Sequence, residues 1–276
     1  MKQNLLKNFI ILNIVLLSSV VIQAAQLQQN PVTQKLLNII NQKQTNLALS
    51  ADAKTKQELL DLADKIGPYI CFFKTHIDIV EDFDQDLILK LKELANKHNF
   101  LLVDDRKFAD IGSTTKSQYT GGVYRFSQWA DIVMVHVISG PDIVKAIKEG
   151  AQEQIKMGNA RGVLLIAQMS CCHNLIDENY TQKVIEIANR YKDFVVGFIA
   201  QEGLDKSDNK TDFLTCTPGV SLTQNKDSLG QNYNSPEYII KDKNCDIIIV
   251  GRGILQAEDP IEMAKIYRDA GWKAYQ

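Results

Sequence analysis

Two acids and a lysine directly follow an apolar run in the stretch LLVDDRKFADIG, residues 101 to 112. Side chains two apart on a strand point to the same side, so Asp105 and Lys107 are expected to project together, with Asp110 on the turn beyond. Such an arrangement can hold a lysine ammonium between carboxylates and direct it at a substrate. The spacing is equally consistent with a structural ion-pair cluster at the start of a helix.

Polar residues also end or follow other apolar runs that are far apart in the sequence. They are Asp52, Lys74, Ser170 and Arg252. Arg252 stands between two glycines, which resembles a phosphate cradle because glycine lets the backbone approach an anion. The long polar stretch from 218 to 236, which contains Gln231 and Tyr233, predicts a lid or binding loop.

These residues need a fold that brings distant strand ends together. From residue 31 onward, short apolar runs alternate with segments at helical spacing, as expected of repeated βα units. The predicted strands are 46–51, 69–74, 100–104, 131–136, 162–168, 194–199, 212–217 and 246–251, and helices are predicted at 54–66, 84–98 and 181–191, with Asp84 and Thr181 as N-caps. Eight such units predict an α/β protein with a (β/α)8 barrel, whose chemistry lies at the carboxyl ends of the strands.

Length and charge narrow the class of function. A chain of 276 residues with 45% hydrophobic residues predicts one catalytic domain, here residues 30–276. The formal net charge of −2 and the absence of a basic stripe argue against nucleic acid as the main partner and favour a small-molecule substrate. The four histidines form no metal-binding pair, and the adjacent Cys171, Cys172 and His173 are a weak alternative metal site.

The first 25 residues have the order of a secretory signal peptide: lysines, an apolar run from 9 to 22, then small residues. The run is shorter than the roughly 20 residues that a membrane-spanning helix needs. Residues 1–25 are therefore expected to lie outside the fold. A cleavable export signal, a membrane anchor and an inert extension remain open.

Five motifs occur in order along the chain: FKTHID at 73–78, DRKFADIG at 105–112, TPGV at 217–220, LGQNY at 229–233 and IVGRGI at 249–254. Together they resemble orotidine 5'-phosphate decarboxylases of the eukaryotic type. The similarity covers roughly residues 30 to 275, and the run from 105 to 112 is highly specific for that family.

The resemblance implies an enzyme without metal or cofactor that converts orotidine 5'-phosphate to UMP and carbon dioxide, the last step of de novo pyrimidine synthesis. It also implies a homodimer, in which Asp110 and Thr114 reach across the interface. The catalytic array would be Lys74, Asp105, Lys107 and Asp110, with Lys107 as the proton donor. Asp52 and Lys74 would hold ribose hydroxyls, Ser170 the pyrimidine edge, and Gln231, Tyr233, Gly251 and Arg252 the phosphate.

The chain departs from the family pattern after the fifth predicted strand. Where Ala-Glu-Met-Ser is expected, the sequence has Ala-Gln-Met-Ser, followed by Cys171, Cys172, His173 and Asn174. Ser170 is retained, but Gln168 replaces a carboxylate. These changes are expected to bear on the pyrimidine side of the site or on docking of the lid.

Two other functions compete with the decarboxylase. One is a relative in the same barrel superfamily that uses an Asp-x-Lys-x-x-Asp site with magnesium on a sugar phosphate. The other is an exported or membrane-tethered nucleotide-binding protein that has lost catalysis, suggested by residues 1–25 and the changes around Cys171. The charged substrate favours a cytoplasmic location, with export or tethering as the alternative.

Overall fold

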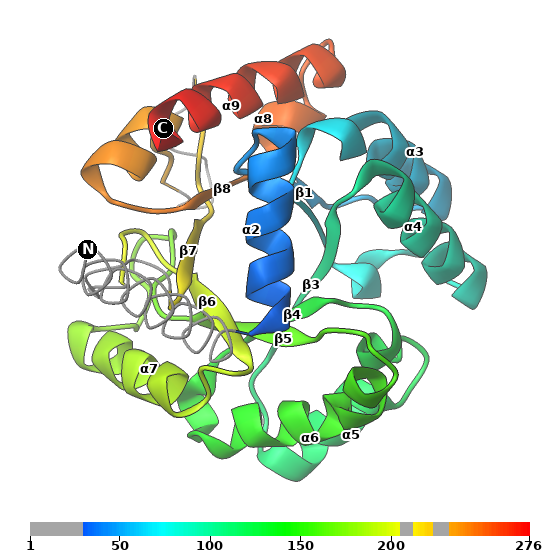
Figure 1. Cartoon of the computed structure of the whole chain (residues 1–276), viewed down its shortest axis with the longest axis vertical. Coiled ribbons are helices and arrows are strands. Elements are labelled where there is room, and N and C mark those ends of the chain that lie inside the picture. The colour runs from blue at the N-terminus through cyan, green and yellow to red at the C-terminus, as the bar shows by residue number, and fades with distance from the viewer. Residues whose placement is uncertain (1–29, 205–211, 223–231) are drawn as a thin grey trace, which may run out of the picture.

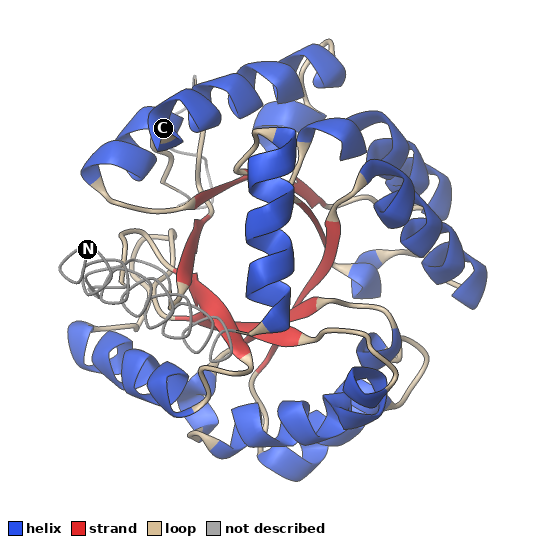
Figure 2. Cartoon of the chain, viewed as in Figure 1, coloured by secondary structure: helices blue, strands red, loops and turns tan. Residues whose placement is uncertain are grey.

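The computed structural model describes residues 30–204, 212–222 and 232–276. Eight parallel strands close into a barrel in the order of the sequence, and helices surround the ring of strands (Figure 2). The strands are β1 Leu47–Ala51, β2 Phe72–Thr75, β3 Leu101–Phe108, β4 Ile132–Val135, β5 Gly162–Ile166, β6 Val195–Ile199, β7 Leu214–Thr217 and β8 Ile247–Val250. The predicted (β/α)8 barrel is confirmed.

The α-helices follow strands around the outside, apart from α2, which precedes β1. They are α2 Pro31–Lys43, α3 Lys56–Ile66, α4 Gln85–His98, α5 Gly112–Thr120, α6 Asp142–Lys156, α7 Glu178–Arg190, α8 Arg252–Leu255 and α9 Pro260–Tyr275. Short helical turns also follow two strands, at Ile77–Ile79 after β2 and at Val137–Ser139 after β4. No helix within the described parts of the chain has both the length and the apolar character needed to cross a membrane.

Apolar side chains form two layers because each strand is buried on both faces. One layer lies between the strands and the outer helices, and the other fills the barrel interior. Helix α2 contributes to the inner layer and lies across one end of the barrel (Figure 1). That end is the amino end of the strands, since Lys43 Nζ of α2 donates to the carbonyls of Ile70 and His98, which precede β2 and β3. The carboxyl ends of the strands are thus left for the site.

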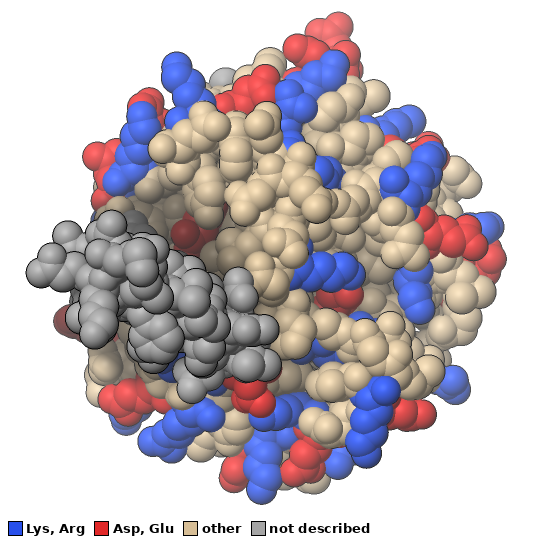
Figure 3. All heavy atoms as spheres, viewed as in Figure 1, with Lys and Arg blue, Asp and Glu red and all other residues tan. Residues whose placement is uncertain are grey.

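On the described part of the face that carries α2, neither kind of charge gathers in one place (Figure 3). Lysine and arginine side chains alternate with acidic side chains around its edge, and uncharged atoms occupy most of the centre (Figure 3). Such interspersed charge gives a weak field over this face.

Helix capping confirms one predicted boundary and corrects another. Asp84 caps α4 as predicted, and its carboxylate accepts from Leu87 N at 3.0 Å. Thr181 was wrongly predicted as the N-cap of α7. Asp177 caps this helix instead, and the Thr181 hydroxyl, one turn inside, donates to the carbonyl of Ala167 at 2.9 Å. The Thr181 hydroxyl thus bonds to the carbonyl of Ala167, just after β5, and the local sequence around Thr181 does not indicate this contact.

The third strand is longer than the sequence predicted. It continues from residue 104 to Phe108, so Asp105 and Lys107 lie within β3 rather than beyond it. Its pairing with β4 shifts register between Asp104 and Phe108. An apolar pattern alone could not reveal this extension, because the added residues are mostly charged.

Candidate functional site

A cavity of about 260 Å³ lies at the mouth of the barrel, at the carboxyl ends of the strands. Its lining joins residues from strands and loops across the whole chain. Among the residues predicted for the site, those that line it are Asp52, Lys74, Asp105, Lys107, Ser170, Tyr233, Gly251 and Arg252. The barrel therefore brings together eight of the eleven predicted residues.

The Asp105 carboxylate lies between two lysine ammonium groups. Lys74 Nζ is 2.6 Å from Oδ2, and Lys107 Nζ is 2.7 Å from Oδ1. The side chains of Lys74 and Asp105 are only 6% and 8% exposed, whereas that of Lys107 is 36% exposed. Asp105 thus anchors one buried and one more accessible cation beside the cavity.

The charged neighbours of Asp105 govern its ionisation. Burial alone would raise the pKa of this carboxyl, but the positive charge of Lys74 and a hydrogen bond from His76 outweigh it, aided by Lys107. The pKa of Asp105 is consequently held well below its usual range. Its negative charge is therefore fixed over the whole physiological range of pH.

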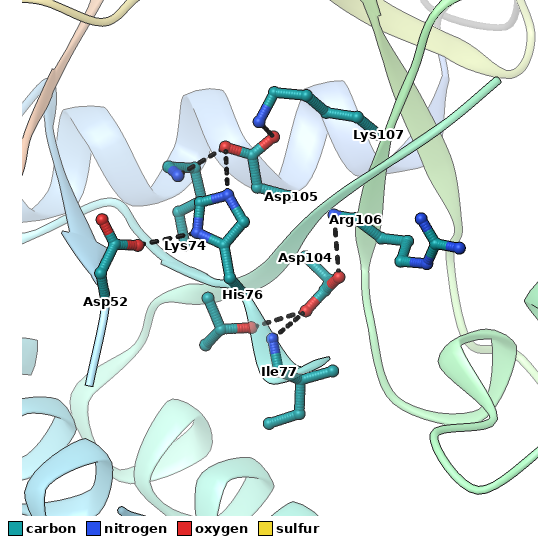
Figure 4. Close-up of polar contacts among 9 residues, drawn as sticks. Asp52, Lys74, His76, Ile77, Asp104, Asp105, Arg106 and Lys107 are labelled. Atoms are coloured by element: carbon teal, nitrogen blue, oxygen red, sulfur yellow. Dashed lines mark hydrogen bonds and ion pairs between the residues drawn. The ribbon is translucent and has the colours of Figure 1, made fainter. Parts of the chain in front are cut away.

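His76 belongs to this cluster, although the sequence analysis did not select it. Its ring joins two carboxylates: Nδ1 is 2.7 Å from Asp52 Oδ1, and Nε2 is 3.2 Å from Asp105 Oδ2 (Figure 4). The FKTHID motif contained the signal, since a histidine two residues after Lys74 at a strand end points toward the same side.

The pKa of His76 leads to a pH-dependent stability. Burial lowers the pKa of the imidazole, but hydrogen bonds to Asp105 and Asp52 raise it by more, so the net shift is upward. A raised pKa in the folded state stabilises the fold fully below the unfolded value of about 6.5, and this contribution is lost as pH rises through the folded value.

We therefore expect His76→Gln to remove part of the decline in stability that the wild type shows above about pH 6.5. Denaturant unfolding of both proteins at a series of pH values measures it. His98→Gln is the matched control, because His98 contacts Asp64 on the outer surface, away from the cavity. Identical pH slopes for His76→Gln and the wild type would show that His76 carries no such linkage.

The backbone of β3 places Lys107 in an unusual way. Lys107 has a φ of 53°, in the left-handed region that residues with a side chain seldom adopt. The bend coincides with the register shift between β3 and β4. This bend changes the direction of the backbone at the end of β3, and the ammonium group of Lys107 remains in contact with Asp105.

Arg252 and Tyr233 lie together in the lining of the cavity. The guanidinium carbon of Arg252 is 5.8 Å from the centre of the Tyr233 ring. The glycine after Arg252 is required by close packing, because a Cβ at Gly253 would stand 2.5 Å from the Tyr267 hydroxyl. A cation, a phenol and glycine backbone at one strand end suit a phosphate group.

Ser170 lines the cavity from the loop after β5, and this loop contacts neighbouring segments. The carbonyl of Ser170 accepts from Asn232 N at 3.2 Å, and Cys172 Sγ lies 3.5 Å from Asn232 Oδ1. Gln168 accepts from Gln201 N at 2.8 Å and donates to the Glu202 carboxylate at 3.2 Å. A glutamate at 168 would face that carboxylate, so glutamine suits its neighbour in this chain.

Two predicted site residues, Asp110 and Thr114, do not line the cavity of this chain. Asp110 and Thr114 are exposed on its outer side, where Asp110 Oδ1 accepts from the backbone of Ile111. Gln231 lies outside the described residues. Among residues 30–204, 212–222 and 232–276, no three or more His, Cys, Asp or Glu side chains form a group that could hold a metal ion.

Solved structures share this fold. Orotidine 5'-monophosphate decarboxylase from Methanocaldococcus jannaschii matches 81% of this chain and 97% of its own length with a TM-score of 0.63 at 24% identity. The decarboxylase from Pyrococcus horikoshii matches 82% of this chain and 98% of its own, with a TM-score of 0.61 at 23% identity. At this identity, the two structures support the fold alone.

Other relatives have a much higher sequence identity to this chain than these two structures. The orotidine 5'-phosphate decarboxylase of Kodamaea ohmeri is 51% identical over 90% of this chain and 94% of its own, and that of Candida parapsilosis is 48% identical over 89% and 91%. The model of the orotidine 5'-phosphate decarboxylase / HUMPS family matches residues 45–267, which include the cavity and its charged cluster. This barrel, with two lysines held on a buried aspartate, belongs to that family.

Proposed function

We propose that this chain converts orotidine 5'-phosphate to UMP and carbon dioxide without a metal ion or organic cofactor. The observation that carries the proposal is the Asp105 carboxylate, buried between the ammonium groups of Lys74 and Lys107 at the wall of the cavity. The relatives that bear the name of this enzyme at about half identity support the same substrate.

Lys107 supplies the chemistry of this proposal. When the bond between the ring carbon and the substrate carboxylate breaks, carbon dioxide leaves and the electron pair stays on the ring carbon. A fixed ammonium next to that carbon stabilises the charge as it develops. Lys107 then gives its proton to the carbon, which yields UMP, and the neutral amine regains a proton from water. Its greater exposure than Lys74 suits this exchange.

Asp105 and Lys74 organise the charge around Lys107. A permanently ionised Asp105 keeps the Lys107 ammonium in place, and its own negative charge faces the substrate carboxylate, which adds ground-state repulsion. Lys74 neutralises the inner side of Asp105 at 2.6 Å. Asp52 and Lys74 hold ribose hydroxyls, and Ser170 contacts the pyrimidine edge.

The phosphate is assigned to the opposite side of the cavity, to Arg252, Tyr233, Gly251 and Gln231. Binding energy from a group that does not react can be used to close and organise a site. The cation and phenol of Arg252 and Tyr233 supply charge-assisted hydrogen bonds for this purpose.

Arg252→Ala is expected to raise the KM for orotidine 5'-phosphate about 100-fold or more, because it removes a charged, planar phosphate contact. Steady-state kinetics measure this change. Arg190→Ala, at the last turn of α7, is the matched control and is expected to leave KM unchanged. If Arg252→Ala weakened binding of orotidine, which has no phosphate, as much as that of the nucleotide, the assignment would be wrong.

We propose a homodimer in which Asp110 and Thr114 complete the site of the neighbouring subunit. Both residues are exposed and outside their own cavity. Exposed apolar side chains lie close to Asp110: Ile111 is 62% exposed and Ile138 is 70% exposed. A hydrogen bond from Ser139 Oγ to the Asp110 carbonyl holds these two loops together. An apolar surface beside a catalytic acid suits a subunit interface.

The direct test of the activity is loss of orotidine 5'-phosphate and gain of UMP with the purified full chain, measured with and without a strong metal chelator. Equal turnover in both conditions is expected. Turnover that the chelator abolishes and magnesium restores would favour the magnesium-dependent sugar-phosphate chemistry instead. Binding of UMP without turnover would favour a nucleotide-binding protein that has lost catalysis.

We also propose that the enzyme acts in the cytoplasm, because its charged substrate and product do not cross membranes unaided. Residues 1–25 lie outside the described residues, and export or tethering through them is the alternative. Cell fractionation and sequencing of the mature N-terminus separate the two. Intact residues 1–25 in a cytoplasmic fraction would support the proposal, and a processed protein in the exported fraction would refute it.

A further inference from the structure

Asp104 is a fully buried carboxylate to which the mechanism above gives no role. It is 0% exposed and immediately precedes Asp105 on β3. Successive strand side chains point to opposite faces, so Asp104 lies behind the strand while Asp105 faces the cavity. A buried acid in that position needs polar partners.

Three hydrogen-bond donors converge on the two oxygens of Asp104 (Figure 4). Oδ2 accepts from the Thr75 hydroxyl at 2.8 Å and from Ile77 N at 3.1 Å. Oδ1 accepts from Arg106 N at 3.0 Å. Both oxygens therefore have at least one partner.

The bonded groups flank the residues of the charged cluster. Thr75 and Ile77 stand on either side of His76, whose ring joins Asp52 and Asp105. Arg106 stands between Asp105 and Lys107, which are in contact at 2.7 Å. One buried carboxylate therefore holds the backbone on both sides of the cluster, at the turn after β2 and at the end of β3.

The end of β3 needs such a restraint. Lys107 has a φ of 53°, and the ladder between β3 and β4 shifts register between Asp104 and Phe108. Regular strand pairing therefore does not hold the backbone between these two residues. The hydrogen bond from Arg106 N to Asp104 fixes it at the residue before the bend.

Asp104 stays buried at an electrostatic cost. Within the described parts of the chain it forms no ion pair, unlike Asp105 a residue later. Burial raises the pKa of Asp104 to about 7, although hydrogen bonds from Ile77 and Thr75 oppose the shift. Burying an acid away from water costs free energy unless hydrogen bonds compensate it.

We propose that Asp104 is a positioning residue that sets the placement of Lys107 and His76 around Asp105 through its hydrogen bonds from the backbone of Ile77 and Arg106. It touches no substrate. The proposal rests on the decarboxylase function for its kinetic consequence. Its structural consequence, restraint of residues 75–77 and 105–107, does not depend on which reaction the site performs.

The test is Asp104→Asn, which keeps the size of the side chain. An amide has only one acceptor oxygen. If this oxygen keeps the hydrogen bonds from Thr75 and Ile77, the NH2 group faces Arg106 N, which is also a donor, and the restraint beside Lys107 is lost. We expect kcat per folded site to fall by about 100-fold, as for a misplaced catalytic group, while UMP affinity is nearly unchanged. Amide hydrogen exchange should rise in residues 105–108.

Two controls separate positioning from general stability. Thr75→Val removes one donor to Asp104 but leaves both backbone hydrogen bonds, and should preserve kcat. Asp131→Asn alters a carboxylate that accepts from Leu102 N at 2.9 Å at the opposite end of β3. It should lower the melting temperature without changing kcat per folded site or exchange in residues 105–108.

Asp104→Asn with normal kcat per folded site, or a loss of kcat equal to that in Asp131→Asn, would overturn the proposal. Rapid exchange confined to residues 105–108, together with a large fall in kcat, would support it. If the wild type itself does not turn over orotidine 5'-phosphate, the proposed function fails. Hydrogen exchange then decides by itself, and unchanged exchange in Asp104→Asn refutes the restraint.

Discussion

Replacing Lys107 by alanine is expected to lower kcat for orotidine 5'-phosphate by about 10⁴-fold or more. The change removes both the ammonium that stabilises the developing carbanion and the proton that completes the reaction. The fold should persist, since the Lys107 side chain is 36% exposed and its partner Asp105 keeps Lys74 at 2.6 Å. Single-turnover kinetics, with circular dichroism and UMP binding on the same sample, measure the result.

The matched control is Lys90→Ala, which removes an exposed lysine that pairs with Asp86 within α4. Exposed pairs of this kind contribute little, so its kinetics should equal those of the wild type. Lys107→Arg tests the proton separately, because guanidinium keeps the charge but holds its proton above pH 12. Near-normal turnover by a folded Lys107→Ala protein would contradict the role of Lys107.

Mixing two inactive variants is expected to restore about a quarter of the wild-type activity. Lys107→Ala and Asp110→Ala should each be inactive as homodimers, because every site lacks one member of the array. After subunit exchange, half of the dimers are hybrids. In each hybrid, one site combines an intact Lys107 with Asp110 of the partner subunit, while the other site lacks both.

A second mixture serves as the control. Lys107→Ala and Asp105→Asn damage residues that line the cavity of the same chain, so no hybrid of the two contains an intact site. Activity should stay absent in that mixture under the same exchange conditions. If Lys107→Ala and Asp110→Ala also failed to complement while exchange was demonstrated by mass, Asp110 would act within its own subunit or not at all.

Local patterns in the sequence were enough to predict the repeated βα units. Each of the eight predicted strands is present, and Asp84 caps α4 as predicted. Burial on both faces of a strand and the spacing of apolar residues on a helix leave short-range signals. Thr181 shows the limit of these signals, because its hydroxyl bonds to Ala167 across a distance of 14 residues and Asp177 takes the cap.

The barrel and the candidates for the charged cluster could be predicted from the sequence, since strand alternation puts Asp105 and Lys107 on one side. The contacts of His76 with Asp52 and Asp105, and the hydrogen bonds of Asp104 behind them, became visible with the folded chain. The contact of His76 with Asp52 spans 24 residues of sequence, and that of Ile77 with Asp104 spans 27. They depend on strand register and barrel closure, which arise from packing of the whole chain rather than from any local pattern.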